Sequence, residues 1–202
     1  MNFIEQYLNQ SKELIDKIDK KEILKTVKII SDVKKNSGRI FFIGSGGGAG
    51  HASHAVNDFR KICNIESYSP SDNVSELTAR INDDGWETSY SNWLKVSRIS
   101  SNDLLFVLSV GGGDEKINVS VNIINCIKTA QEVNANIVGI VGKKHGYTAI
   151  NSNSCIIIPE VDPTLITPHT ESFQAVIWHL IISHPLLASN MTKWESLNEE
   201  TK

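Results

Sequence analysis

The sequence has little cysteine, no long hydrophobic run and no excess of basic residues. Its three cysteines are an odd number without regular spacing, which excludes a disulfide framework or a cysteine-based zinc knuckle: Cys63, Cys126 and Cys155. The apolar runs, such as 40–43 and 156–159, are far too short to cross a bilayer. The N-terminus lacks the basic start and the apolar centre of a secretory signal. We therefore expect a cytoplasmic protein with reduced thiols and no membrane partner.

The charge balance argues against a nucleic-acid partner. The chain has 20 Lys and Arg residues against 23 Asp and Glu residues, with a formal net charge of -3. Proteins that bind nucleic acids usually present a basic face to the phosphate backbone. The basic cluster at 17–25 is interrupted by Asp19 and Glu22, which is typical of a solvated helix surface. We expect no nucleic-acid partner.

Length and apolar content favour one domain. A chain of 202 residues, 40% of them hydrophobic, can bury one substantial core, so we expect a single domain over 1–202. Between Phe3 and Val33 apolar residues recur at steps of three and four, which predicts one long helix or two in succession within 1–35. The polar stretch 190–202 is a predicted tail.

Four compact apolar runs predict β-strands. They alternate with helical patterns at 49–62, 118–133 and 170–183. The four runs are 39–44, 103–109, 136–142 and 154–159. Apolar strands separated by helices are typical of a parallel sheet that is covered on both faces. The order predicts a doubly wound α/β fold, whose ligand site lies at the carboxyl ends of the strands. The polar segment 72–93 predicts a short helix and a loop.

Glycine-rich turns follow the first two predicted strands. The first is Gly44-Ser45-Gly46-Gly47-Gly48-Ala49-Gly50, and the second runs from Ser109 to Asp114. Glycine lets the backbone approach a ligand, and the N-terminus of the next helix attracts anions. Neither a Walker lysine nor the glycine spacing of dinucleotide-binding proteins is present. One such turn alone is equally compatible with no ligand, but two at neighbouring strand ends favour a ligand crevice.

Two predicted helices carry histidine and carboxylate side chains at helical spacing. His54 and Asp58 are four residues apart, and Glu171 and His179 are two turns apart. Imidazole and carboxylate groups can bind a divalent metal or move protons during catalysis. From spacing alone, a surface hydrogen bond between His54 and Asp58 is the more frequent explanation.

These residues carry a resemblance to a known family. Residues 44–58 resemble the phosphoheptose isomerase motif Gly-Asn-Gly-Gly-Ser-Ala-Ala-Asp-Ala-Gln-His-x-x-x-Glu. The run from Asn82 to Trp86 is similar to that family's Asn-Asp-x-Gly-aromatic loop. The run from Glu171 to His179 is similar to its late Gln-x7-His helix. The sequence thus resembles the SIS-domain phosphoheptose isomerases, also called sedoheptulose 7-phosphate isomerases.

The resemblance implies an SIS fold and an aldose–ketose isomerase for surface-polysaccharide heptose. It implies a zinc ion bound by His54, Asp58, Glu171 and His179, which should converge at the mouth of the sheet. Among these, Asp58 or Glu171 would be the catalytic base and His179 the acid. Substrate contacts would come from two glycine-rich turns and the Asn-Asp pair: Ser45, Gly46, Gly47, Asn82, Asp83, Ser109, Val110, Gly111 and Asp114. The resemblance further implies a homotetramer assembled through the helical region 1–35, with a neighbouring subunit completing the site.

Departures from the family pattern leave alternatives open. Asp58 replaces a glutamate and Glu171 a glutamine, and the hydroxyl-rich phosphate loop is here mostly glycine. Phosphate would then rest on backbone N–H groups, with Lys116 or Ser120 as further contacts. The alternatives are an isomerase of another phosphosugar, and a phosphosugar-binding or initiator-associating SIS protein without catalysis.

Overall fold

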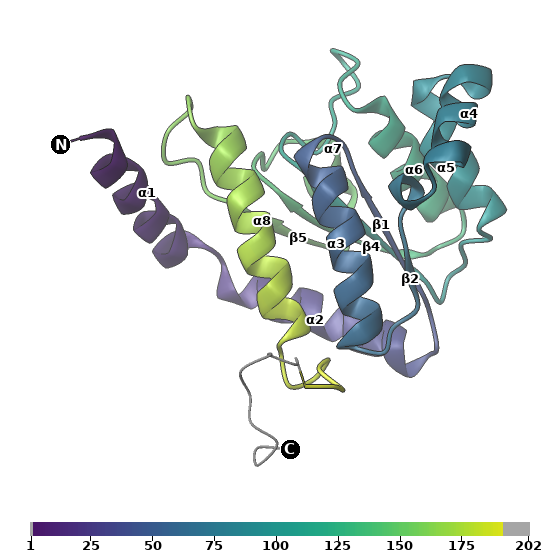
Figure 1. Cartoon of the computed structure of the whole chain (residues 1–202), viewed down its shortest axis with the longest axis horizontal. Coiled ribbons are helices and arrows are strands. Elements are labelled where there is room, and N and C mark those ends of the chain that lie inside the picture. Colours follow the sequence, from purple (N-terminus) through teal and green to yellow (C-terminus); the bar gives the residue numbers. More distant parts are fainter. Residues whose placement is uncertain (1, 192–202) are drawn as a thin grey trace.

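The computed structural model describes residues 2–191 and places five parallel strands in one sheet (Figure 1). Their order across the sheet is β2-β1-β3-β4-β5. The strands are β1 (Ile40–Gly44), β2 (Ser67–Tyr68), β3 (Leu104–Ser109), β4 (Asn136–Val141) and β5 (Ser154–Ile157). The predicted parallel arrangement of the four apolar runs is confirmed. The sequence pattern missed β2, because two residues are too few to show a period.

Apolar side chains on both faces explain why the strands are central. Every residue of β1 and β3 is buried, and the two strands pair in register from Ile40 opposite Leu104. On one face the rings of Phe42 and Phe106 stack with centroids 5.0 Å apart. On the other face the ring of Phe41 meets that of Trp93 edge to face at 5.7 Å. The sheet is therefore the middle layer of a three-layer fold.

Helices cover both faces of the sheet, as a doubly wound fold requires (Figure 1). One face is covered by α2 (Lys20–Lys35), α3 (Gly47–Lys61) and α8 (Ile166–Ile182). The other is covered by α5 (Trp86–Val96) and α6 (Val121–Glu132), with the short α7 (Tyr147–Asn151) beside β4. Because parallel strands end at the same edge, the turns that begin α3, α6 and α7 all lie at the carboxyl edge of the sheet.

The N-terminal region consists of two helices, α1 (Phe3–Lys17) and α2, and only α1 leaves its apolar side uncovered. The side chain of Asp19 caps α2 by accepting the N–H groups of Lys21 and Glu22. Four apolar residues of α2 are buried in the chain's own core, Ile23, Val27, Ile30 and Val33, whereas Leu24 on the same helix is exposed. The oligomerisation role predicted for 1–35 stays a prediction, and within this region α2 also packs against β5. In contrast, α1 projects from the sheet (Figure 1) and exposes Phe3, Ile4, Leu8 and Ile15.

The segment 72–93 contains more helix than predicted. A single 3-10 turn (Pro70–Asp72) leads into α4 (Val74–Asp84), and α5 follows after one residue. That residue is Gly85, whose positive φ of 83° reverses the chain between the helices. The expectation of one short helix with a loop was therefore wrong.

Most of the predicted tail at 190–202 lies outside the described residues. None of the helices within 2–191 combines the length and the apolar character that a membrane crossing requires.

Candidate metal and substrate site

The first glycine-rich turn brings α3 directly against β3. Gly46 begins the helix with a φ of 58°, a conformation that favours glycine. Gly48 leaves no room for a side chain, because a Cβ there would lie 2.3 Å from the carbonyl oxygen of Leu108 in β3. The position of α3, and of every side chain it carries, is therefore set by a backbone-to-backbone contact.

The structure brings together three of the four predicted metal ligands. His54 and Asp58 come from α3 and His179 from α8, which packs beside it. The Oδ2 atom of Asp58 lies 3.6 Å from Nε2 of His54 and 3.8 Å from Nε2 of His179. All three ligand atoms lie within 4.8 Å of one another. We call these three residues the triad.

A buried tryptophan that the sequence reasoning missed supports both imidazoles. The ring of Trp178 stacks on that of His179 with centroids 3.5 Å apart, and its centroid lies 4.8 Å from that of His54. Trp178 itself is fully buried in the core beneath the triad. A second contact fixes the imidazole of His179, because its Nδ1 lies 2.7 Å from the carbonyl oxygen of Ala175 and donates to it. Its Nε2 is thereby left as the nitrogen with a free lone pair.

The donor set of the triad fits a divalent transition metal. Two imidazole nitrogens and a carboxylate oxygen are a common ligand set for zinc. Ligand atoms bound tetrahedrally at about 2.0–2.1 Å lie about 3.4 Å from each other. The two pairs with Asp58 are close to this separation, and the triad as a whole, which spans up to 4.8 Å, would draw together around an ion. The bond from His179 to a backbone carbonyl is the outer contact that metal-binding histidines usually make. His54 is 57% exposed and His179 is 47% exposed, so a further ligand could reach a bound ion from solvent.

Glu171, the fourth predicted ligand, does not belong to this group. It lies eight residues before His179 on α8, about 12 Å along the helix axis. Its carboxyl group lies over the first turn of α3, where a Cβ on Gly47 would be 2.6 Å from it. A carboxylate is favourable at a helix N-terminus. Burial lowers the pKa of the neighbouring His51, and the charge of Glu171 opposes this shift. The metal and base roles of Glu171 stay predictions.

The triad also lies away from the predicted place at the mouth of the sheet. His54 is seven residues beyond the start of α3, about 10 Å from the carboxyl edge of the strands. The triad therefore faces outward from α3 and α8, whereas Glu171 remains at the edge of the sheet.

The first turn and the Asn-Asp pair belong to different elements of the fold. Ser45, Gly46 and Gly47 form the turn between β1 and α3. The Nδ2 atom of Asn122, a buried residue that the sequence reasoning missed, lies 3.4 Å from the hydroxyl of Ser45. At the end of α4, Asn82 and Asp83 are exposed and hydrogen-bond to each other.

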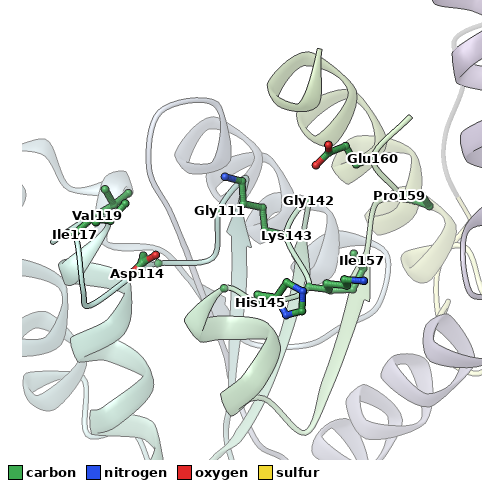
Figure 2. A pocket seen from close by; sticks show the side chains of 13 residues that line it. Gly111, Asp114, Ile117, Val119, Gly142, Lys143, His145, Ile157, Pro159 and Glu160 are labelled. Atoms are coloured by element: carbon green, nitrogen blue, oxygen red, sulfur yellow. The ribbon is translucent and has the colours of Figure 1, made fainter. Parts of the chain in front are cut away.

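The second glycine-rich turn lines a cavity of about 610 Å³ at the carboxyl ends of β3, β4 and β5 (Figure 2). Of the predicted contacts in this turn, Gly111 and Asp114 line the cavity. The carbonyl of Val110 accepts the N–H of Gly142, and the hydroxyl of Ser109 accepts the N–H of Gly112. The sequence reasoning missed three further lining residues, Lys143, Lys144 and His145, although a basic run directly after a predicted strand was a visible signal.

Comparisons with known proteins agree with this architecture. Over 188 residues the chain is 24% identical to a phosphoheptose isomerase from Helicobacter pylori, covering 89% of this chain and 92% of the relative. It is 24% identical over 158 residues to a phosphoheptose isomerase from Rhodospirillum rubrum, covering 76% and 78%.

A solved structure shares the fold. Phosphoheptose isomerase GmhA from Neisseria gonorrhoeae superposes with a TM-score of 0.76 at 19% identity, covering 89% of this chain and 95% of that one. Residues 6–142 match the SIS domain family, which is more than half of the chain. The chain belongs to the SIS domain family.

Proposed function

We propose that this protein is a sugar-phosphate isomerase that interconverts an aldose and a ketose in the cytoplasm. The substrate proposed is sedoheptulose 7-phosphate, converted to a D-glycero-D-manno-heptose 7-phosphate for surface polysaccharide. The observation that carries the proposal is the convergence of His54, Asp58 and His179 from two helices that are far apart in the sequence. The names of the curated relatives support the substrate class.

In the proposed reaction Asp58 acts as the base. It removes the proton from the carbon beside the carbonyl group, which gives a cis-enediolate, and returns this proton to the former carbonyl carbon. The hydroxyl proton of the substrate passes to the former carbonyl oxygen, so that the atoms balance. Its carboxylate suits this role because it is only 14% exposed and lies between two imidazoles. A zinc ion held by the triad would stabilise the negative charge that develops on the substrate oxygens.

The geometry separates the two roles predicted for His179. Its Nδ1 donates to the carbonyl of Ala175, so Nε2 is the atom that can face a metal or a substrate. A nitrogen whose lone pair binds a metal cannot carry a proton at the same time. We therefore assign His54 and His179 to metal binding, and the acid role of His179 would apply only without a bound ion.

We further propose a homotetramer in which a neighbouring protomer completes the site. The triad is open to solvent, and Glu171 lies about 12 Å from His179 along α8. Two apolar residues of α8 next to His179 are also exposed, Val176 and Leu180. Exposed apolar residues around polar groups are typical of an interface. A second protomer packed here would cover both residues and bring its own side chains near the triad.

Turnover of a sugar phosphate tests the proposed function. The purified protein is incubated with sedoheptulose 7-phosphate, and the product is followed by NMR after chelation and after readdition of zinc. We expect heptose 7-phosphate from the zinc-loaded protein and at least about a tenfold loss on chelation, because the ion stabilises developing charge. Other ketose and aldose phosphates are tested in parallel. Binding of these compounds without turnover of any of them, with zinc present, would indicate a phosphosugar-binding SIS protein instead.

A substitution on the exposed apolar side of α1 tests the proposed homotetramer. This helix is held in place, because the side-chain amide of Gln10 bonds to Asp162 and His169 of the same chain. We expect Leu8→Glu to shift the protein from tetramer to smaller species in sedimentation velocity, since it would place a charge in a subunit interface. Gln6→Glu, an exposed residue on the same helix, is the matched control and should leave the tetramer intact. A monomeric parent protein at micromolar concentration would contradict the proposal.

A further inference from the structure

We propose that the cavity beyond β3, β4 and β5 binds the phosphate group of the substrate through Lys143 and Lys144. This inference rests on the proposed function and names residues that hold its substrate. The two lysines belong to the turn between β4 and α7, not to the glycine-rich turn after β3. Both line the cavity together with His145 (Figure 2).

The two turns that form the cavity are joined by backbone hydrogen bonds. The N–H of Gly142 donates to the carbonyl of Val110, and the N–H and hydroxyl of Thr148 both donate to the carbonyl of Gly112. At Gly146 the turns touch so closely that a Cβ would lie 2.0 Å from the carbonyl oxygen of Gly111. The cavity is therefore already formed, and a ligand does not have to organise these turns.

The glycine-rich turn itself offers few side-chain donors to a phosphate. Ser109 keeps a hydroxyl, but this residue is buried and its oxygen accepts the N–H of Gly112. The positions that follow are Val110, Gly111, Gly112 and Gly113. Lys116, which the sequence suggested as a contact, does not line the cavity, and its N–H bonds to the carboxylate of Asp114. Positive side chains for an anion must therefore come from another element.

Lys143 and Lys144 supply that positive charge. Within residues 2–191 neither lysine forms an ion pair with a carboxylate, so both ammonium groups remain available. Figure 2 shows the ammonium group of Lys143 beside Gly111, with His145 below it and Glu160 to its right. A phosphate has three oxygens that accept charge-assisted hydrogen bonds from ammonium groups. The carboxylates of Asp114 and Glu160 can accept hydrogen bonds from hydroxyl groups.

The lining therefore selects a ligand with a phosphate at one end and hydroxyls along its length. The cavity also has apolar surface from Ile117, Val119, Ile157 and Pro159, against which carbon–hydrogen groups of such a ligand can pack. A volume of about 610 Å³ is within the range of small-molecule sites. A phosphorylated polyhydroxy compound satisfies all three features.

Binding of inorganic phosphate and sugar phosphate by lysine variants tests this inference. The full-length protein and Lys143→Gln, Lys144→Gln and the double variant are titrated by calorimetry with inorganic phosphate, sedoheptulose 7-phosphate and unphosphorylated sedoheptulose. We expect each single variant to weaken both phosphate compounds by about tenfold, because each removes one charge-assisted hydrogen bond. In turnover, KM should rise by a similar factor while kcat changes less than about twofold. The lost contact to the phosphate group binds the substrate and the transition state equally, so its removal weakens binding without slowing the chemical step.

A matched control separates a local effect from the loss of one charge. Lys95→Gln on α5 removes the same charge from an exposed residue outside the cavity lining and should leave affinity and KM unchanged. Unchanged phosphate affinity in the double variant would overturn the inference even if the enzyme turns over sugar phosphate. The binding measurement needs no turnover, so loss of phosphate affinity in the double variant supports the site even if no isomerase activity is found.

Discussion

Replacing Asp58 by asparagine is expected to lower kcat by at least about a hundredfold, in line with the usual contribution of a general base. The substitution keeps the shape of the side chain but removes the proton acceptor and one negative charge. Asp58 is the residue that joins the triad, because its Oδ2 atom lies within 3.8 Å of both imidazole Nε2 atoms. Activity and metal content per protomer are measured together.

Two further variants serve as a control for lost charge and as a test of metal binding. Asp32→Asn removes an exposed carboxylate from α2 and should leave both readouts unchanged. His54→Ala should lose both metal and turnover, because it removes a ligand rather than the base. An active Asp58→Asn enzyme would exclude Asp58 as the base. The proposed mechanism would then require Glu171, the other carboxylate predicted for that role.

Gly48→Ala is expected to reduce activity by about a hundredfold, although residue 48 contacts neither metal nor substrate in the proposal. A methyl group at this position would lie 2.3 Å from the carbonyl oxygen of Leu108, so α3 must move away from β3. That movement would carry His54 and Asp58 away from His179. We also expect the free energy of unfolding to fall by about 1–3 kcal/mol, the usual cost of overpacking. Chemical denaturation and steady-state kinetics measure the two effects.

Gly50→Ala is the matched control for this variant. Gly50 lies on the same helix, and a Cβ at this position meets no atom within 4 Å. Alanine should therefore keep activity and raise the free energy of unfolding by about 0.5–1 kcal/mol, because it favours the helix over glycine. If Gly48→Ala behaved like Gly50→Ala, the backbone contact between α3 and β3 would not determine the position of the triad.

The sequence by itself determined those strands and helices that can be recognised from the order of apolar and polar residues within a short segment. The strands that became β1, β3, β4 and β5 are visible as apolar runs, because a strand buried on both faces needs apolar residues throughout. The alternation of strands with helices then implied a parallel sheet. The resemblance to family motifs predicted His54, Asp58 and His179 as site residues, because motif residues are recognised by their spacing along the chain.

The tertiary structure decided which of these residues meet. Glu171 and His179 share a helix, yet a separation of two turns leaves only His179 beside Asp58. Packing also decided that α2 belongs to the core while α1 does not, although both carry similar apolar periods. The β4–α7 turn, which carries Lys143 and Lys144, lies against the glycine-rich turn because backbone hydrogen bonds connect the two segments, which are about 30 residues apart in sequence. Periodicity along a chain reports which side of an element is apolar, whereas distances between elements depend on backbone contacts that no local pattern records.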